Sequence, residues 1–225
     1  MTCKPLVVSE TSEGRGFEPR SRHHDTSKGV LPFQLNAASR CDLASIMSET
    51  LLSMNNVQRH YETPAGVVKA LDGVSFEIHE GERVILLGPS GSGKTTLLNC
   101  LSALDSPTGG NYTFSNAEVP RNHSEKMTSF RRENIGYVFQ FFNLLQDLSV
   151  LENILLIQEL AGKKDPARAK ELLKLVGLEA EVDRFPGEIS GGQQQRVAIA
   201  RSIAKRPTLL LGDELTGNLD TETSN

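Results

Sequence analysis

Residues 84–98 constrain the fold of this chain more than any other stretch. The apolar run 84–87 predicts a buried strand, a glycine-dense turn follows it, and an apolar helix begins directly after the turn. The turn fits the spacing G-x-x-x-x-G-K-[ST], with Gly88 as its first residue and Thr95 as its last. The order of strand, loop and helix favours a phosphate-binding loop over the alternative, a plain glycine turn.

The residue types of this loop suit the binding of a nucleotide phosphate. Glycines let the backbone turn its N–H groups inward, through dihedral angles that a Cβ would forbid. Lys94 is placed to reach the β- and γ-phosphates, and the Thr95 hydroxyl is a ligand for Mg²⁺. The helix that follows presents its N-terminal N–H groups and the positive end of its dipole to the anion.

Composition limits the class of protein. The 225 residues are enough for one α/β domain with a subdomain, and 24 Lys and Arg against 28 Asp and Glu do not predict the basic surface of a nucleic-acid-binding protein. Cys3, Cys41 and Cys100 are too widely spaced to indicate a disulfide framework or a zinc site, which fits a reducing, cytosolic compartment. No apolar window is long enough to span a membrane, so we expect a soluble chain that reaches a membrane through a partner.

Residues 1–46 are polar and without apolar periodicity, and we interpret them as a disordered or spurious extension. Met47 resembles a second start, because patterned sequence begins directly after it. The predicted domain is therefore 47–225.

Before the loop, residues 54–58 and 70–78 predict antiparallel strands, with a turn at 62–66. Tyr61 ends the first of these strands. Its ring is either a platform for a nucleotide base or an ordinary core aromatic, and the sequence pattern leaves both open.

After the loop, the pattern predicts a helix over 95–103, a strand over 111–115 and a buried strand over 135–139 that ends at Gln140. A polar residue at the end of a parallel strand is a candidate site residue, with a solvated loop residue as the alternative. After Gln140, the apolar residues recur with the spacing of a helix. Capping patterns at Ser149 and Asp165 predict two helices of an inserted subdomain over about 141–205.

Two glycines in the first turn of a helix mark a second candidate site. Ser190 and Gln193 have the spacing of a capping box, and Gly191 and Gly192 lie between them. Glycine destabilises a helix, so the pair is explained best if an anion approaches the backbone closely at this N-terminus.

The short apolar run 208–212 predicts a buried strand that ends in Asp213 and Glu214. Two adjacent carboxylates at such a position are costly to bury unless they face a cation or a water molecule to be activated. Asp213 is suited to hold Mg²⁺ through its water shell, and Glu214 to polarise an attacking water.

From about Ser53 to Asp220 these segments resemble the ATP-binding subunit of an ATP-binding cassette (ABC) transporter, and 190–196, Ser-Gly-Gly-Gln-Gln-Gln-Arg, is similar to its signature sequence. The resemblance implies an α/β fold: a P-loop NTPase core with a mostly parallel sheet, an antiparallel β subdomain and the inserted helical subdomain. The runs 139–145 and 217–220 are most similar to the branch of macrolide exporters and lipoprotein-releasing systems. The residues 217–220 match the D-loop.

The resemblance also implies roles for particular residues. Glu214 and Gln140 would be catalytic, and Thr95, Gln140 and Asp213 would serve the metal. The residues expected to contact ATP, with Tyr61 stacked on its base, are Tyr61, Gly88, Pro89, Ser90, Gly91, Ser92, Gly93, Lys94, Thr95, Thr96, Ser190, Gly191, Gly192 and Gln193. Partners implied are an integral membrane permease and a second ATP-binding subunit, most simply a homodimer, at the inner face of the cell membrane.

The sequence departs from the family pattern in three places. Ile189 stands where Leu is usual, and Gly212 and Leu215 replace Ala and Pro around the carboxylates. Family members continue beyond the equivalent of Asn225 into a strand that carries a switch histidine. That strand lies between the two strands that flank the site, so we expect Leu86 and Leu210 to face a gap.

Two other functions are compatible with these motifs. One is a soluble ABC ATPase of translation or DNA repair, although such proteins usually carry two cassettes or a long coiled-coil insertion. The other is a nucleotide-binding fragment without catalysis. An ATPase subunit that powers a separate permease accounts for more of the motifs than either.

Overall fold

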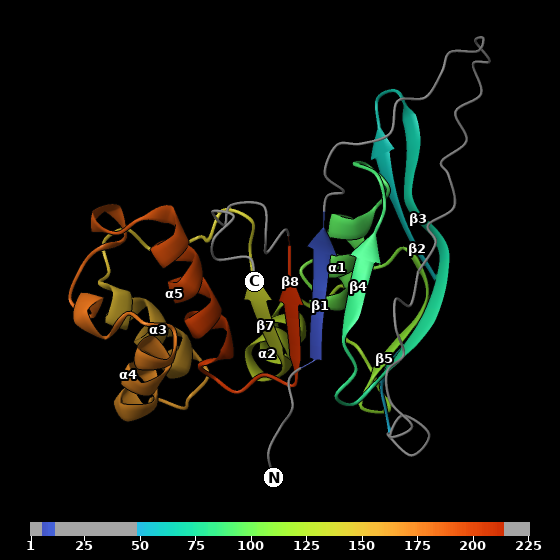
Figure 1. The fold of residues 1–225 in the computed structure, drawn as a ribbon. Coiled ribbons are helices and arrows are strands. Elements are labelled where there is room, and N and C mark those ends of the chain that lie inside the picture. Colours follow the sequence, from blue (N-terminus) through green and yellow to red (C-terminus); the bar gives the residue numbers. More distant parts are fainter. Residues whose placement is uncertain (1–5, 12–48, 214–225) are drawn as a thin grey trace.

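The computed structural model describes residues 6–11 and 49–213, which form two sheets and a group of helices (Figure 1). The first sheet is parallel and has the order β4-β1-β8-β7, with β1 at Leu6–Thr11, β4 at Val84–Leu87, β7 at Ile135–Val138 and β8 at Leu209–Gly212. The second is antiparallel and has the order β3-β2-β5-β6, with β2 at Thr50–Thr63, β3 at Gly66–His79, β5 at Gly109–Phe114 and β6 at Ala117–Glu118.

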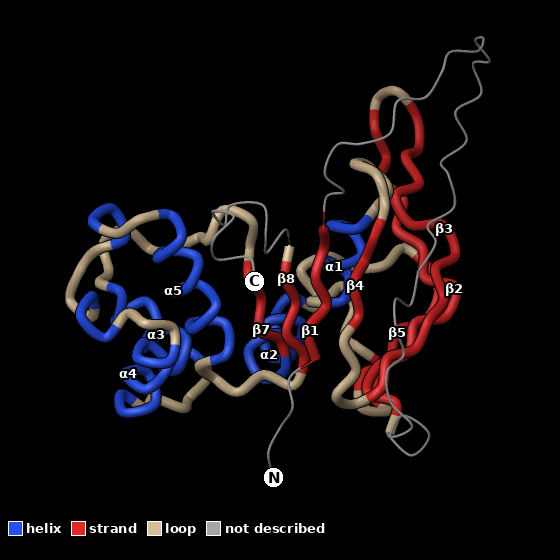
Figure 2. The backbone as a smooth tube through the Cα atoms, in the orientation of Figure 1, coloured by secondary structure: helices blue, strands red, loops and turns tan. Residues whose placement is uncertain are grey.

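The helices divide between the sheets and a separate helical region. Those beside the sheets are α1 at Lys94–Leu101 and α2 at Ser124–Asn134. The helical region contains α3 at Val150–Leu160, α4 at Pro166–Leu175, the short 3₁₀ turns η2 at Glu179–Glu181 and η3 at Pro186–Glu188, and α5 at Gly191–Ile203. Figure 2 shows this region beyond β7, on the opposite side of the parallel sheet from the antiparallel one. The α/β class and the three parts predicted from the sequence are confirmed.

One hydrophobic core joins α1 to both sheets. Leu97, Leu98 and Leu101 on α1 are fully buried, and they belong to one cluster with residues of the antiparallel sheet, such as Leu52, and of the parallel sheet, such as Leu86. Burying side chains of this size contributes about 1.5 to 3 kcal/mol each. The helix that follows the phosphate-binding loop is therefore held from two sides.

A second core lies in the helical region. It contains Ile154, Leu172 and Val197 from three helices, together with Val138 of β7 and Leu210 of β8. Because neighbouring residues of a strand point to opposite faces, Leu210 packs against the helices while Leu209 and Leu211 pack in the first core. The helical region is thus anchored on β7 and β8.

The structure corrects the interpretation of the N-terminal residues. Residues 6–11 are not disordered, since they form β1, and the rest of the predicted extension lies outside the described residues. The predicted gap is also wrong: β1 lies between β4 and β8 and pairs with both. Its apolar residues, Leu6 to Val8, form a run shorter than the four to eight residues that indicate a buried strand, and its conformation depends on two strands distant in the sequence.

The other differences are smaller. The 54–58 strand extends over Thr50–Thr63 and forms a hairpin with β3 that turns at Pro64 and Ala65. The helix predicted to end at 103 ends at Leu101, and the strand predicted to end at 139 ends at Val138. No prediction was made for α2. Its sequence is mostly polar and buries only Met127, so its apolar periodicity is weak.

Candidate functional site

Three predicted parts of the site lie at the carboxyl ends of the strands of the parallel sheet. The phosphate-binding loop follows β4, Gln140 comes shortly after β7, and Asp213 follows β8. Parallel strands end at the same edge, and Val138 lies opposite Gly212 in the register of β7 and β8. The Asp213 backbone N–H donates to the carbonyl of Val138 at 3.0 Å, which fixes the start of the Asp213 segment beside the end of β7.

The loop adopts a conformation that requires glycine at two positions. Gly91 and Gly93 have φ angles of +79° and +92°. A Cβ at Gly93 would lie 2.4 Å from the Ala70 carbonyl oxygen of β3, so this glycine is needed for space as well as for its dihedral angles. The close approach to β3 sets where α1 begins, because Gly93 is the residue that caps it.

Lys94 is folded into the loop rather than into solvent. Its side chain is 5% exposed, and Nζ donates to the carbonyl oxygens of Gly88 at 2.8 Å and Pro89 at 3.0 Å. A buried ammonium needs such partners, and phosphate oxygens are stronger acceptors than carbonyls. The Lys94 ammonium therefore lies at the place where the motif predicts a bound phosphate.

The residues of the loop fit a bound nucleotide phosphate. Within the part of the chain that the structure describes, the Ser92 hydroxyl is buried without a hydrogen-bond partner, and a Cβ at Gly88 would lie 2.8 Å from it. The cap residue Gly93 gives the first turn of α1 no side-chain cap. A polar hydroxyl, a buried ammonium and a helix N-terminus around one loop are a donor set for an anion.

Tyr61 on β2 is held next to α1 by a residue that follows this helix. Its hydroxyl donates to Asp105 Oδ2 at 2.8 Å, and the guanidinium of Arg59 lies 4.3 Å from its ring centroid. Burial, followed by the hydrogen bond to Asp105, raises the pKa of Tyr61, whereas the neighbouring Arg59 lowers it. Asp105 follows α1, so its hydrogen bond holds this ring beside the helix of the phosphate-binding loop.

Sequence reasoning missed the two residues that hold Tyr61. Arg59 Nε donates to the same carboxylate oxygen of Asp105 at 2.8 Å. Burial alone would lower the pKa of Arg59, but Asp105 and Tyr61 raise it overall. Asp105 was read only as part of a chain-breaking cluster, and the one available signal was its acidic side chain shortly after the loop helix.

Ser190, Gly191, Gly192 and Gln193 lie away from the phosphate-binding loop of the same chain. They begin α5, which packs on β7, whereas the loop follows β4 at the opposite edge of the sheet (Figure 1). The capping box is confirmed: Gln193 N–H donates to Ser190 Oγ, and Ser190 N–H donates to Gln193 Oε1. A Cβ at either glycine would meet nothing within 4 Å, so this helix end is open to an approaching group.

Arg201 is a further residue that the sequence analysis did not single out. From α5 it donates to the carbonyl oxygens of Asn143 at 2.7 Å and Phe142 at 2.6 Å. Both of these residues have positive φ angles, and they follow Gln140 in the loop after β7. Arg201 therefore positions the segment that carries Gln140. Glu214 and the 217–220 segment lie outside the described residues.

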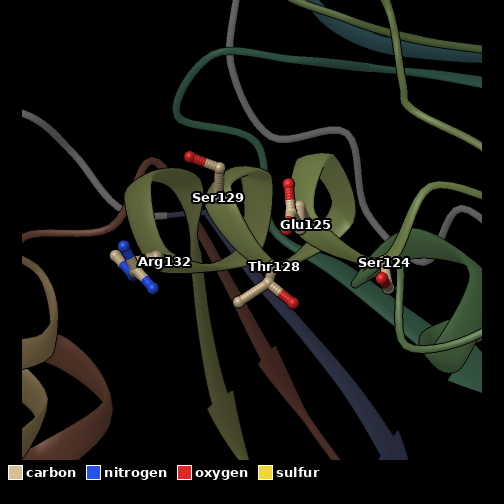
Figure 3. Close-up of a pocket in the computed structure, with 5 residues that line it drawn as sticks. All are labelled: Ser124, Glu125, Thr128, Ser129 and Arg132. Carbon is tan, nitrogen blue, oxygen red and sulfur yellow. The ribbon is translucent and has the colours of Figure 1, made fainter.

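Two surface hollows in the described part of the chain are lined by residues other than those predicted for the site. One of about 320 Å³ is lined by Ser124, Glu125, Thr128, Ser129 and Arg132. Figure 3 shows that all five come from α2 and that their side chains do not converge. Another, of about 420 Å³, lies against Arg59 and Asp105. Among the helices described here, none is both long and apolar enough to cross a bilayer.

Comparisons with known proteins agree with this arrangement. The family model for ABC transporters matches residues 71–217. An ABC transporter ATP-binding protein of Thermotoga maritima is 49% identical, over 77% of this chain and 75% of its own length. A lipoprotein-releasing system ATP-binding protein of Caulobacter vibrioides is 42% identical, over 79% of each.

A solved structure is similar over the same part of the chain. The dimeric ATP-binding cassette MJ0796, in a post-hydrolysis state with ADP and Pi, superposes with a TM-score of 0.71 at 40% identity, covering 76% of this chain and 77% of that one. Fold, motif and relatives lead to one conclusion. The chain belongs to the ABC transporter family, as a subunit that binds and hydrolyses ATP.

Proposed function

We propose that two copies of this chain bind two ATP molecules between them, each in the phosphate-binding loop of one copy and against residues 190–193 of the other. One observation supports this most strongly. The loop follows β4, which is one edge strand of the parallel sheet, whereas α5 packs on β7, which is the other edge strand. A single chain therefore does not bring the loop and the open N-terminus of α5 together. The MJ0796 cassette, which is similar over most of this chain, is dimeric.

In this proposal each residue of the site has a separate task. Lys94 exchanges its two carbonyl partners for phosphate oxygens, which are the stronger acceptors. The free face of the Tyr61 ring stacks on the base, because the Arg59 guanidinium already covers the other. Thr95, Gln140 and Asp213 hold Mg²⁺, which neutralises charge on the phosphates. Glu214 orients the water that attacks the γ-phosphate in line.

The finer assignments of partner and place belong to the same proposal. The domain spans about 47–225 together with residues 6–11, which supply β1, and its helical subdomain lies at about 141–205. The dimer associates with an integral membrane permease at the inner face of the cell membrane and is placed there by that partner. A relative at 42% identity is the ATP-binding protein of a lipoprotein-releasing system, which supports a transport role for this subunit.

Trapping the dimer tests this proposal. Replacing the proposed water-positioning carboxylate in Glu214→Gln should preserve Mg-ATP binding and abolish turnover, so that dimers accumulate. Light scattering with Mg-ATP should show a mass near twice that of the chain. The same chain with Lys94→Ala in addition should remain monomeric, because its ATP affinity should fall at least about tenfold, or ~1.4 kcal/mol.

Two results would contradict the proposal. Hydrolysis by Glu214→Gln at the parental rate would remove Glu214 from the chemistry. A Glu214→Gln chain that binds Mg-ATP but stays monomeric would mean that residues 190–193 do not complete the site in a second copy.

A further inference from the structure

The carboxylate of Asp105 joins the aromatic ring of the candidate site to the helix that follows the phosphate-binding loop. Its Oδ2 atom accepts hydrogen bonds from the Tyr61 hydroxyl and from Arg59 Nε, each at 2.8 Å. Its Oδ1 atom accepts the backbone N–H of Ser106, also at 2.8 Å. Both oxygens of this carboxylate are therefore engaged, and its side chain is only 25% exposed.

The segment that carries Asp105 is bound to two elements. The Asp105 backbone N–H donates to the carbonyl oxygen of Asn99 in the last turn of α1, at 3.1 Å. Further along the segment, the Thr108 N–H donates to the Gln58 carbonyl oxygen at 2.7 Å, and the His60 N–H donates to Thr108 Oγ1 at 3.2 Å. The segment thus connects α1 to β2, the strand that carries the aromatic ring.

Two contacts restrict the Tyr61 ring. Its hydroxyl is anchored at the rim by Asp105, and the Arg59 guanidinium lies over one face, 4.3 Å from the ring centroid. The same carboxylate oxygen orients the guanidinium, so a single group holds both. A ring that is restricted in this way loses less conformational entropy when a base stacks on it.

We propose that Asp105 is a positioning residue for the nucleotide base. It holds Tyr61 and Arg59 in the arrangement on which the base stacks, and its attachment to α1 fixes this arrangement relative to the phosphate-binding loop. The inference rests on the proposed function, in which the Tyr61 ring stacks on the base. In this role Asp105 touches neither base nor phosphate, so it acts on the share of the affinity that the base contributes.

Comparing ATP with inorganic triphosphate separates the share of the base from that of the phosphates. Without Mg²⁺, which hydrolysis requires, calorimetric titration of the full chain measures the affinity for each ligand. Asp105→Ala should lower ATP affinity by about five- to tenfold, which is part of what a stacked base contributes, and should change triphosphate affinity by less than about twofold. Asp105→Asn keeps an acceptor oxygen, so its ATP affinity should lie between those of Asp105→Ala and the parent.

Two further measurements distinguish positioning from general damage. Glu118→Ala in β6 removes a different carboxylate, which accepts from Arg121 at 3.1 Å, and this control should bind both ligands as the parent does. In a Tyr61→Ala chain, where the ring is gone, adding Asp105→Ala should cause no further loss of ATP affinity. Loss of stability alone would instead weaken both ligands and would add to the effect of Tyr61→Ala.

Three results would overturn the inference. Equal losses for ATP and triphosphate in Asp105→Ala would mean that this residue acts on the phosphate-binding loop or on the fold. Loss of ATP affinity in Tyr61→Ala with parental affinity in Asp105→Ala would remove Asp105 and leave the proposed function intact. Parental ATP affinity in Tyr61→Ala would remove the ring from base binding, so the proposed role of Tyr61 and that of Asp105 would fail together.

Tyr61→Phe covers the case in which Asp105→Ala does not fold. It keeps the ring and removes only its hydrogen bond to the carboxylate, so ATP affinity should fall about two- to threefold at unchanged triphosphate affinity. Parental ATP affinity in both Tyr61→Phe and Asp105→Asn would contradict a positioning role for Asp105.

Discussion

Gly91 and Gly93 have similar φ angles but different surroundings. A Cβ at Gly91 would meet nothing within 4 Å, whereas one at Gly93 would lie 2.4 Å from a backbone oxygen of β3. The conformational cost of an L residue is about 1 to 2 kcal/mol at either position. Only at Gly93 would the added Cβ also clash with a backbone atom. A backbone atom cannot move aside as the end of a flexible side chain can.

We therefore predict different losses of stability for two alanine variants. Gly91→Ala should lower the free energy of unfolding by about 1 to 2 kcal/mol, and Gly93→Ala by at least about 2 kcal/mol more, because β3 or the loop must shift. Urea denaturation without nucleotide measures both. Equal losses in the two variants would show that the loop moves away from β3 without cost.

At the residue scale the motif predicted that glycines turn the loop, and the positive φ angles of Gly91 and Gly93 agree with this prediction. It could not predict the partners of Tyr61. Arg59 is only two residues away, but Asp105 follows α1, and its place beside Tyr61 depends on how α1 packs against the antiparallel sheet. Contacts between segments distant in the chain leave no local signal.

At the scale of elements, the loop after β7 depends on a helix from elsewhere in the sequence. Arg201 of α5 donates to two carbonyl oxygens of residues held at positive φ, Phe142 and Asn143. Burial lowers the pKa of Arg201, and the two carbonyls offset part of that desolvation. The guanidinium thus connects α5, which begins with the signature residues, to the loop that carries Gln140.

Removing this connection should loosen one loop and leave the phosphate-binding loop unchanged. Arg201→Met keeps most of the apolar stem but loses both hydrogen bonds, so we expect about 2 to 3 kcal/mol less stability and faster hydrogen exchange over residues 140–145. Arg201→Lys should recover part of the loss through one ammonium. Unchanged exchange over 140–145 in Arg201→Met would show that other contacts hold the loop.

Elements with strong local signals were predicted, and those that depend on tertiary pairing were missed. The capping box at Ser149 is present, with Glu152 N–H donating to Ser149 Oγ at 3.2 Å, and the N-cap at Asp165 accepts from the Arg168 N–H at 2.9 Å. By contrast, β1 pairs with two strands that lie far along the chain, β4 and β8. Its apolar residues, Leu6 to Val8, form too short a run to indicate a strand by themselves.

At the scale of the whole molecule, two cores share β7 and β8. Ile135 of β7 and Leu209 and Leu211 of β8 belong to the core around α1, while Val138 of β7 and Leu210 of β8 belong to the core of the helical region. Apart from these two strands, the cores are made of different elements. In such a chain one core can unfold locally, because it can lose its packing while β7 and β8 remain paired with each other.

An alanine substitution that opens a cavity in one core should therefore speed hydrogen exchange in different elements from one that opens a cavity in the other core. Leu98 on α1 and Leu172 on α4 are both buried, with 0% and 1% of their surface exposed. Alanine at either should lower the free energy of unfolding by about 2 to 5 kcal/mol. Native-state hydrogen exchange should separate them: Leu172→Ala should speed exchange in α3, α4 and α5 and leave β2, β3 and β5 protected, because none of these strands contributes to the helical core. Leu98→Ala should speed exchange in both sheets, since α1 packs against both.

If Leu172→Ala instead speeds exchange equally in the helices and in β2, β3 and β5, the two cores unfold as a single cooperative unit and the helical region does not open independently.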